Sequence, residues 1–311
     1  HELAAACTEF DHQDPELRIL RYPMPDLDYL PYQPNPEFSA HEKLGIEAQF
    51  RSIVQQFSPD LVIAGRESYA SVVIPLARTA GLPCVQLLRG SPTSQIIAGT
   101  YPKGLGEAFI RCLQSADAVI AVSEFMAGEI RERGVSQAFC IPNAVDTGHF
   151  RPSDRGGEIL SDLDLPTGAP IVLSPSNLLP RKRPLDLLRA AEIALLEEPS
   201  LQFVFLGDGT DAEKFASAVR RSPARENLHL LGWRPYQDMP ALLNAADLVV
   251  MTSESEGMSR ACIETMACGT LLIASDIPPA RELIDEGRSG LLFPVGDCPA
   301  LAERILWAVG H

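Results

Sequence analysis

The sequence predicts an α/β protein made of two doubly wound, Rossmann-like domains that face a cleft. Short apolar segments alternate with amphipathic segments along most of the chain, which is the pattern of parallel strands covered by helices on both faces. The chain has 311 residues, and a domain commonly holds roughly 150 residues. A stretch rich in Gly, Pro, Asp and Ser at residues 151–170 indicates a junction near residues 146–166. We therefore expect one domain over residues 1–148 and a second over residues 149–311.

In the first half the alternation is less regular. Residues Leu3–Cys7 and Leu17–Tyr22 are predicted strands, and five prolines between residues 23 and 36 exclude a helix or a central strand from the loop that follows. The elements predicted after this loop are a helix over 39–57, the strand Leu61–Ala64, a helix over 68–80, the strand Cys84–Leu88, a helix over 103–115, the strand Ala118–Val122, a helix over 124–133 and the strand Cys140–Pro142.

In the second half the alternation is clear. Between residues 184 and 198 apolar side chains recur at steps of three or four, which makes one stripe along a helix, and Pro184 and Pro199 mark its two ends. The predicted strands are Ile171–Ser174, Gln202–Leu206, Leu228–Leu231, Leu248–Met251, Leu271–Ala274 and Leu291–Phe293. The predicted helices cover 184–198, 211–221, 237–246, 259–268, 278–285 and 298–309.

Composition narrows the classes of partner. Acidic residues outnumber basic ones 41 to 26, for a net charge of -15, and both halves share the excess. Such a surface disfavours nucleic acid and anionic lipid as partners. No apolar run is long enough for a transmembrane segment, although peripheral membrane contact stays open. The seven cysteines are scattered without metal-binding spacing, so no metal site is predicted. Reduced thiols and the absence of a signal peptide lead us to expect a cytoplasmic protein.

The most informative segment is residues 253–269, which follows a predicted strand and opens a helix. Backbone N–H groups of Gly257, Met258 and Ser259 would form an anion site suited to phosphate at the start of this helix. Glu256 and Glu264 would repel a phosphate, so we expect them to bind the hydroxyl groups of a sugar or a ribose. The alternative is that Glu256 is an ordinary charge at the N-terminus of the helix and Glu264 a solvated helix residue.

Two further loops follow predicted strands. Arg181, Lys182 and Arg183 are consecutive cations in an acidic chain, and they would neutralise a diphosphate at a strand's carboxyl end. The alternative is a solvated basic turn. The tight turn Gly207-Asp208-Gly209 permits a close backbone approach. Dinucleotide, P-loop and serine-nucleophile motifs are absent from the sequence, and no histidine has a diagnostic spacing.

Together these segments resemble the retaining GT-B glycosyltransferases of family 4. Residues 253–269 are similar to the family's E-x7-E signature, residues 207–209 to its GDG turn, and residues 176–183 to its phosphate loop. Residues 141–152 resemble its "PNGVD…F.P" string, and residues 290–294 its "GLLFP" strand. The likeness covers nearly all of residues 117–311 in the family's order and is fainter before them.

The resemblance implies transfer of a sugar from a nucleotide diphosphate sugar to an acceptor hydroxyl, with retention and without metal. Residues 1–148 would form the acceptor-side domain, and residues 149–311 the donor-binding domain. Glu264 would hold the ribose, Glu256 the hydroxyls of the donor sugar, and Lys182 the diphosphate. No cofactor is implied, and the acceptor is a glycan, a lipid or a small molecule. The residues implied in catalysis are Glu256, Lys182 and Arg89. Those implied in donor binding are Glu264, Gly257, Met258, Ser259, Asn177, Arg181, Arg183, Gly207, Asp208 and Gly209.

The sequence also departs from the family pattern. Asn177 stands where the phosphate loop has Arg, Arg89 stands where the N-terminal domain has His, and Ala144 replaces a Gly. Residues 1–3 resemble the opening of the family's second strand, so the family's first strand is expected to be missing from this chain. The family's last crossover helix is likewise expected to be missing after residue 311. These departures keep a catalytically silent nucleotide-sugar or glycan binding module open as an alternative. A sugar-nucleotide epimerase is a third alternative, which the lack of a histidine at a cleft strand end disfavours.

Overall fold

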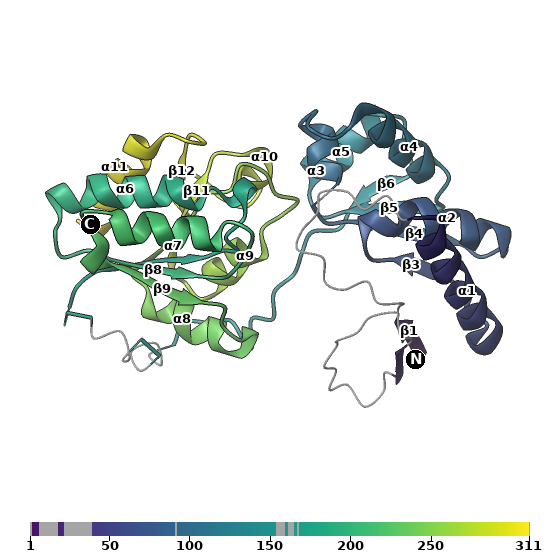
Figure 1. Cartoon of the computed structure of the whole chain (residues 1–311), viewed down its shortest axis with the longest axis horizontal. Helices are drawn as coiled ribbons and strands as arrows, with labels where there is room; N and C mark the ends of the chain where they lie inside the picture. Colours follow the sequence, from purple (N-terminus) through teal and green to yellow (C-terminus); the bar gives the residue numbers. More distant parts are fainter. Residues whose placement is uncertain are drawn as a thin grey trace. The chain divides into compact units, whose positions relative to one another are not determined.

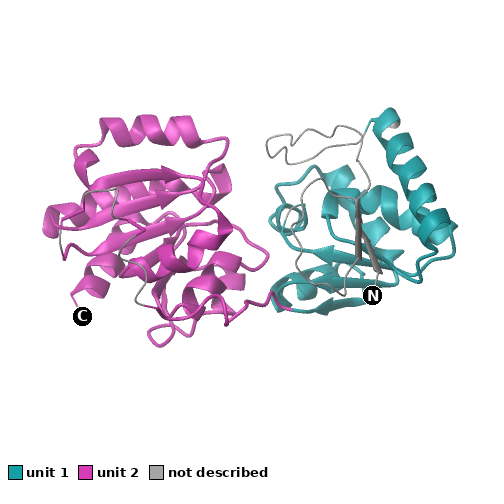
Figure 2. Cartoon of the chain, turned by 90° about the horizontal axis from the view of Figure 1, so that it is seen from below, with its two compact units in different colours: residues 1–141 teal, residues 142–311 magenta. Residues whose placement is uncertain are grey.

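The structure is a computed structural model that describes residues 2–5, 18–21, 39–90, 92–153, 159–160, 165–166 and 168–310. The chain divides into two compact units, His1–Ile141 and Pro142–His311, shown in two colours in Figure 2. The sequence prediction placed the domain junction between residues 148 and 149. The predicted proline-rich loop lies outside the described residues.

Unit 1 contains a four-stranded parallel sheet in the order β3-β4-β5-β6 (Figure 1). A further parallel pair is formed by β1 and β2. The strands are β1 (Glu2–Ala5), β2 (Arg18–Arg21), β3 (Val62–Ala64), β4 (Cys84–Leu88), β5 (Ala118–Ala121) and β6 (Ala138–Cys140). The helices are α1 (Ala40–Phe57), the 3-10 turn η1 (Glu67–Tyr69), α2 (Ala70–Thr79), α3 (Thr93–Ile97), α4 (Lys103–Gln114) and α5 (Glu124–Glu132).

The helix predicted over 68–80 is the 3-10 turn η1 followed by α2, and two further elements of unit 1 differ more clearly from the sequence prediction. The last strand lies at Ala138–Cys140 rather than Cys140–Pro142, because Pro142 has no N–H to extend the ladder beyond the bond from Ile141 N to Ala121 O. Helix α3 was not predicted, since five residues are too few to display a helical period. The start of α1 follows its sequence signal: Ser39 and Glu42 form a reciprocal capping box.

Unit 2 contains a six-stranded parallel sheet in the order β12-β11-β10-β7-β8-β9. The strands are β7 (Ile171–Pro175), β8 (Gln202–Leu206), β9 (Leu228–Gly232), β10 (Leu248–Met251), β11 (Leu271–Ser275) and β12 (Leu291–Phe293). The helices and 3-10 turns are η4 (Pro180–Lys182), α6 (Pro184–Glu197), α7 (Ala212–Arg221), η5 (Arg225–Asn227), η6 (Tyr236–Asp238), α8 (Met239–Ala245), α9 (Arg260–Ala267), α10 (Pro278–Arg281) and α11 (Cys298–Val309).

Helices cover both faces of the unit 2 sheet, as the prediction of a doubly wound fold required. Phe203 and Phe205 of β8 pack with side chains of α6, α7 and α11. The alternate residues Val204 and Leu206 pack with side chains of α8, α9 and α10 on the other face. Successive strand residues point to opposite faces of the sheet, so a strand that is buried on both faces is largely apolar. The polar loops lie at the carboxyl edge of the sheet.

Two predicted helices of unit 2 are shorter than expected by two or more residues at one end. Residues 237–246 begin with the 3-10 turn η6 before α8, and only residues 278–281 of the predicted helix 278–285 are helical. No helix among the described residues combines the length and the apolar character needed to cross a membrane.

Candidate functional site

Three loops of unit 2 meet where β7, β8 and β10 end. Strand β7 lies between β10 and β8, so the carboxyl ends of all three strands are neighbours. Leu178 N donates to Asp208 O at 2.9 Å, and Glu254 N donates to Arg181 O at 2.9 Å. Thr252 Oγ1 donates to Lys182 O at 2.7 Å. These bonds hold the loop after β7 to both neighbours and bring together segments predicted separately.

The turn after β8 depends on its two glycines. A Cβ atom on Gly207 would lie 2.4 Å from Ser176 O, and one on Gly209 would lie 2.4 Å from Leu178 O. Both distances are far inside normal contact, so this turn packs its backbone directly on the backbone of the loop after β7. Asp208 is exposed, and its Oδ1 accepts from Gly209 N at 2.7 Å. Asn177, in the loop after β7, is also exposed.

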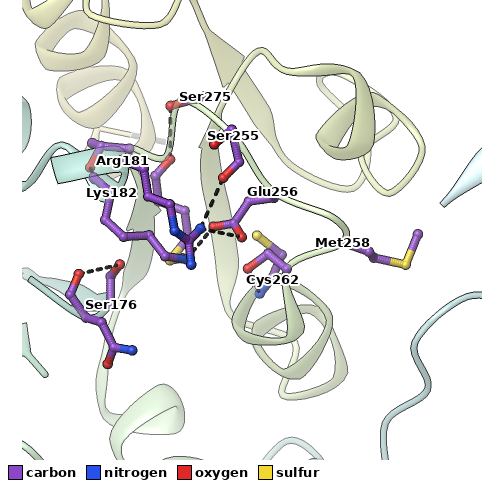
Figure 3. Close-up of polar contacts among 12 residues, drawn as sticks. Ser176, Arg181, Lys182, Ser255, Glu256, Met258, Cys262 and Ser275 are labelled. Carbon is purple, nitrogen blue, oxygen red and sulfur yellow. Dashed lines mark hydrogen bonds and ion pairs between the residues drawn. The ribbon is translucent and has the colours of Figure 1, made fainter. Parts of the chain in front are cut away.

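At the centre of the site, the Glu256 carboxylate lies between two cations (Figure 3). Lys182 Nζ donates to Glu256 Oε1, and Arg181 Nη1 lies 3.3 Å from Glu256 Oε2. Arg181 Nη1 also donates to Ser255 O at 3.2 Å. The side chains of Lys182 and Glu256 are each 12% exposed. The structure thus pairs the residue predicted for sugar hydroxyls with the residue predicted for the diphosphate.

Arg183 forms its ion pairs with other carboxylates than Glu256. Its Nε donates to Asp186 Oδ2 at 2.5 Å, and its Nη1 donates to Glu254 Oε2 at 3.2 Å. These hydrogen bonds raise the pKa of Arg183, with the bond to Asp186 as the largest cause. Two carboxylates therefore neutralise Arg183. In contrast, Arg181 and Lys182 share the carboxylate of Glu256, so this cluster of three charged groups carries a net charge of +1.

The cluster keeps Glu256 ionised. Burial raises the pKa of this carboxyl, but the charges of Lys182 and Arg181 and the hydrogen bond from Lys182 outweigh burial and leave the pKa below its ordinary value of 4.5. At neutral pH the site therefore holds a carboxylate that accepts hydrogen bonds beside two cations that donate them. An anion can compete for the cations, and hydroxyl groups can compete for the carboxylate.

Helix α9 begins one residue later than predicted. Ser259 is its N-cap, and Ser259 Oγ accepts from Cys262 N at 3.4 Å. Gly257 and Met258 are buried before the cap, and Met258 O accepts from Asn143 Nδ2 at 2.9 Å. The first helical hydrogen bond runs from Ile263 N to Ser259 O, so the four N–H groups without a helical partner belong to residues 259–262, and of the three predicted residues only Ser259 is among them.

Glu264 is buried on α9 and is 7% exposed. Tyr236 Oη donates to Glu264 Oε1 at 3.0 Å, and Arg260 Nη2 lies 3.5 Å from the same oxygen. The guanidinium of Arg260 also lies over the Tyr236 ring, 5.4 Å from its centre. Sequence reasoning missed Tyr236; its position shortly after the end of β9 is the signal that could have found it.

A small pocket, partly open to solvent, borders this cluster. Its polar lining comprises Ser253, Glu256, Ser259 and Ser275, over an apolar floor. Cys262 also lines the pocket, and burial raises the pKa of its thiol to about 11. At neutral pH this thiol stays protonated and is a poor nucleophile.

Arg89 lies in unit 1, directly after β4, and its side chain is exposed. Its backbone N–H donates to Glu67 Oε1 at 2.6 Å. Glu67 is a buried carboxylate that sequence reasoning did not single out, and its position three residues after β3 was the available signal. No group of three or more His, Cys, Asp or Glu side chains in the described ranges is arranged to hold a metal ion.

Known proteins match both units. The family model "Glycosyltransferase Family 4" matches residues 1–149, and the model "Glycosyl transferases group 1" matches residues 157–310. Among curated relatives, the alpha-maltose-1-phosphate synthase of Mycolicibacterium smegmatis is 28% identical over 211 residues. The matched region covers 63% of this chain and 54% of that protein, so this chain spans about half the relative's length.

Solved structures match the fold. Sucrose-phosphate synthase from Thermosynechococcus elongatus is 19% identical with a TM-score of 0.83, and the match covers 99% of this chain and 79% of that one. Anabaena Alr3699/HepE in complex with UDP is 20% identical with a TM-score of 0.74, over 94% of this chain and 76% of that one. Two parallel α/β units, the matched models and these relatives show that this chain belongs to the group 1 glycosyltransferases of family 4, which have the GT-B fold.

Proposed function

We propose that the protein transfers a sugar from a nucleotide diphosphate sugar to an acceptor hydroxyl, with retention of the anomeric configuration and without a metal ion. The observation that carries this proposal is the cluster of Arg181, Lys182 and Glu256, which offers surplus positive charge and a carboxylate in one place. Family membership supports the reaction class. The complex of the Anabaena protein with UDP favours UDP sugars as the first donors to test.

In this proposal Lys182 and Arg181 bind the diphosphate. Negative charge grows on the leaving diphosphate as its bond to the sugar's anomeric carbon breaks, and cations already in place stabilise that charge. The anomeric carbon then bonds to the acceptor oxygen, and the acceptor's proton passes to a leaving phosphate oxygen. No separate protein base is needed for this proton balance.

Glu256 and Glu264 have separate roles in the proposal. When phosphate takes Lys182 and Arg181, Glu256 is released to accept hydrogen bonds from the hydroxyl groups of the donor sugar. Glu264 is already oriented by Tyr236 and Arg260, and its free acceptor capacity suits a ribose hydroxyl. The acceptor is a glycan, a lipid or a small molecule, and no cofactor is proposed.

We also propose a cytoplasmic location for the reaction. In the described part of the chain Cys84, Cys112, Cys262, Cys268 and Cys298 are reduced thiols, which fits a reducing compartment.

One observation favours a second candidate, a binding module without transfer activity. Asn177 stands at the exposed end of the loop after β7, in the position that an Arg takes in the family pattern, so one bidentate cation for the leaving group is replaced by an amide. Arg183 does not supply this charge, because Asp186 and Glu254 hold it.

The deciding experiment has two stages. The first stage is a thermal-shift screen with UDP, GDP, ADP and their sugar conjugates, in the presence of EDTA. One of these nucleotides should raise the melting temperature of the protein. Lys182→Gln should remove that shift, whereas the exposed Lys214→Gln should keep it. NMR of the product formed from the selected donor then reports transfer and anomeric configuration. Binding with slow donor hydrolysis and no transfer would identify the binding module, and an unchanged shift in Lys182→Gln would overturn the proposed donor site.

A further inference from the structure

Two arginines stand at one edge of the unit 1 sheet. Arg66 follows β3 by two residues, and Arg89 directly follows β4. The two strands pair in parallel, with Ala64 opposite Gln86, so both arginines leave the sheet at its carboxyl edge. Both are exposed. Residues 1–150 contain 18 acidic and 11 basic residues, so two adjacent cations at this edge contrast with the acidic character of the unit.

The carboxylate of Glu67, which lies beside the Arg89 loop, makes its hydrogen bonds to other donors than the two guanidinium groups. Glu67 Oε1 accepts from Arg89 N at 2.6 Å and from Gly90 N at 2.7 Å. Glu67 Oε2 accepts from Thr93 N at 2.8 Å and from Thr93 Oγ1 at 2.5 Å. A carboxylate offers about four lone-pair positions, and these four donors use them. Glu67 therefore fixes the backbone of the Arg89 loop and leaves both guanidinium groups to other partners.

The surroundings of the two guanidinium groups also leave them available. The Arg66 guanidinium lies over the Tyr69 ring, 6.0 Å from its centre, a contact that leaves its N–H edge to other acceptors. Within the ranges that the structure describes, neither Arg66 nor Arg89 forms an ion pair with a carboxylate. In the same unit Arg51, Arg131 and Arg133 do form such pairs, whereas Arg78 donates to the backbone carbonyl of Ser115. The carboxyl edge of a parallel sheet is also where α/β proteins bind ligands.

We propose that Arg66 and Arg89 form an anion-binding subsite for the acceptor, so that the acceptor carries a phosphate or a carboxylate group. This inference rests on the proposed function, because it assigns the subsite to the acceptor of that reaction. Two guanidinium forks carry two positive charges and match a phosphate dianion in charge and in hydrogen-bond geometry. The Tyr69 ring contacts the Arg66 guanidinium and would form one side of the subsite. Glu67 fixes the backbone of the Arg89 loop through its hydrogen bonds.

The test titrates the 311-residue chain with inorganic pyrophosphate and with glucose 6-phosphate, using calorimetry. The variants are Arg66→Gln/Arg89→Gln, Lys182→Gln and, as a matched control, Arg111→Gln, which removes an exposed cation from α4. We expect two classes of pyrophosphate site in the original chain. The double variant should bind at one of them at least about tenfold more weakly, since it loses charge-assisted hydrogen bonds. The double variant should also bind glucose 6-phosphate more weakly than the original chain does. Arg111→Gln should bind both probes with the affinity of the original chain.

The outcomes separate this inference from the proposed function. Unchanged binding of both probes by the double variant overturns the acceptor subsite. Loss of a site in the double variant together with unchanged binding by Lys182→Gln leaves the subsite standing and overturns the donor site. Far-ultraviolet circular dichroism checks that the double variant is folded, as expected for exposed substitutions. If it is not, Arg66→Lys/Arg89→Lys keeps the charge and should still lose about threefold in affinity, because Lys lacks the planar fork; unchanged affinity would again overturn the subsite.

Discussion

Lys182 and Glu256 form an ion pair across 74 residues of sequence, between the loop after β7 and the loop before α9. Both side chains are 12% exposed. The lysine expected to hold a diphosphate is therefore already occupied by the carboxylate expected to hold the sugar. Binding of a donor must exchange this internal contact for contacts to the ligand.

Glu256→Gln should therefore separate binding from transfer. Removing the competing negative charge should strengthen the binding of the nucleoside diphosphate alone by about threefold to tenfold, while sugar transfer falls by about a hundredfold or more. Calorimetry measures the binding, and product NMR measures the transfer. Glu254→Gln, which removes a carboxylate from Arg183 instead, is the control and should show neither effect. Weaker diphosphate binding in Glu256→Gln would contradict the exchange of contacts.

Glu264→Ala should weaken nucleotide binding by about tenfold, because a buried acceptor for a ribose hydroxyl is lost. Tyr236→Phe should weaken it by about threefold, since the carboxylate loses the donor that orients it at 3.0 Å. Glu213→Ala, on the exposed surface of α7, serves as the control. Calorimetry that shows unchanged nucleotide affinity in Glu264→Ala would disprove the ribose assignment.

Acid should remove the contribution of Glu256 to stability. Its folded-state pKa lies below the ordinary value of 4.5, so ionised Glu256 stabilises the fold above pH 4.5, and this stabilisation is lost as the pH falls through the folded-state pKa. At pH 7 the melting temperature of the original chain should exceed that of Glu256→Gln by a few degrees. For a unit of this size, 1 kcal/mol of stability corresponds to about 2–4 °C. The gap should narrow below pH 4.5. A gap that is constant with pH would contradict the ion pair's role.

Gly207→Ala should destabilise unit 2 by about 2 kcal/mol or more, because its Cβ would overlap the carbonyl oxygen of Ser176 at 2.4 Å. The φ of +103° at Gly207 adds strain for any other residue. Gly128→Ala is the contrasting control, since its Cβ would meet nothing within 4 Å inside α5. That change should stabilise the chain by about 0.5–1 kcal/mol. Thermal melting of the two variants gives the comparison, and a Gly207→Ala chain as stable as the original would refute the backbone packing.

Glu67→Gln should destabilise unit 1 by about 2–4 kcal/mol. The amide keeps only one oxygen for the four donors that meet Glu67 and turns its NH2 group toward the rest. Urea unfolding reports the change through the transition midpoint. Glu129→Gln breaks a partly exposed ion pair with Arg133, and it should cost less than about 1 kcal/mol. Equal midpoints for the two variants would count against the role of Glu67.

Much of the fold follows from local sequence. Strands β4, β8, β10 and β12 have the predicted bounds, because each is a short, largely apolar run between polar turns, a signal that needs no knowledge of its neighbours. Of these strands, β8 and β10 are buried along their whole length. Helix α3 and the true position of β6 could not be found in this way. The first is too short to show a period, and the second depends on which carbonyl of β5 its backbone reaches.

Sequence by itself determined the α/β class, the order of the elements and the residues that come to one edge of the unit 2 sheet, since each of these depends on spacing along the chain. Tertiary structure alone decided the long-range partners: Glu256 with Lys182 and Arg181, Arg183 with Glu254, and Glu264 with Tyr236. The charge of a residue at a strand end can be read from the sequence. The partner of a buried charge depends on which loops lie side by side, and the order of strands in the sheet decides this.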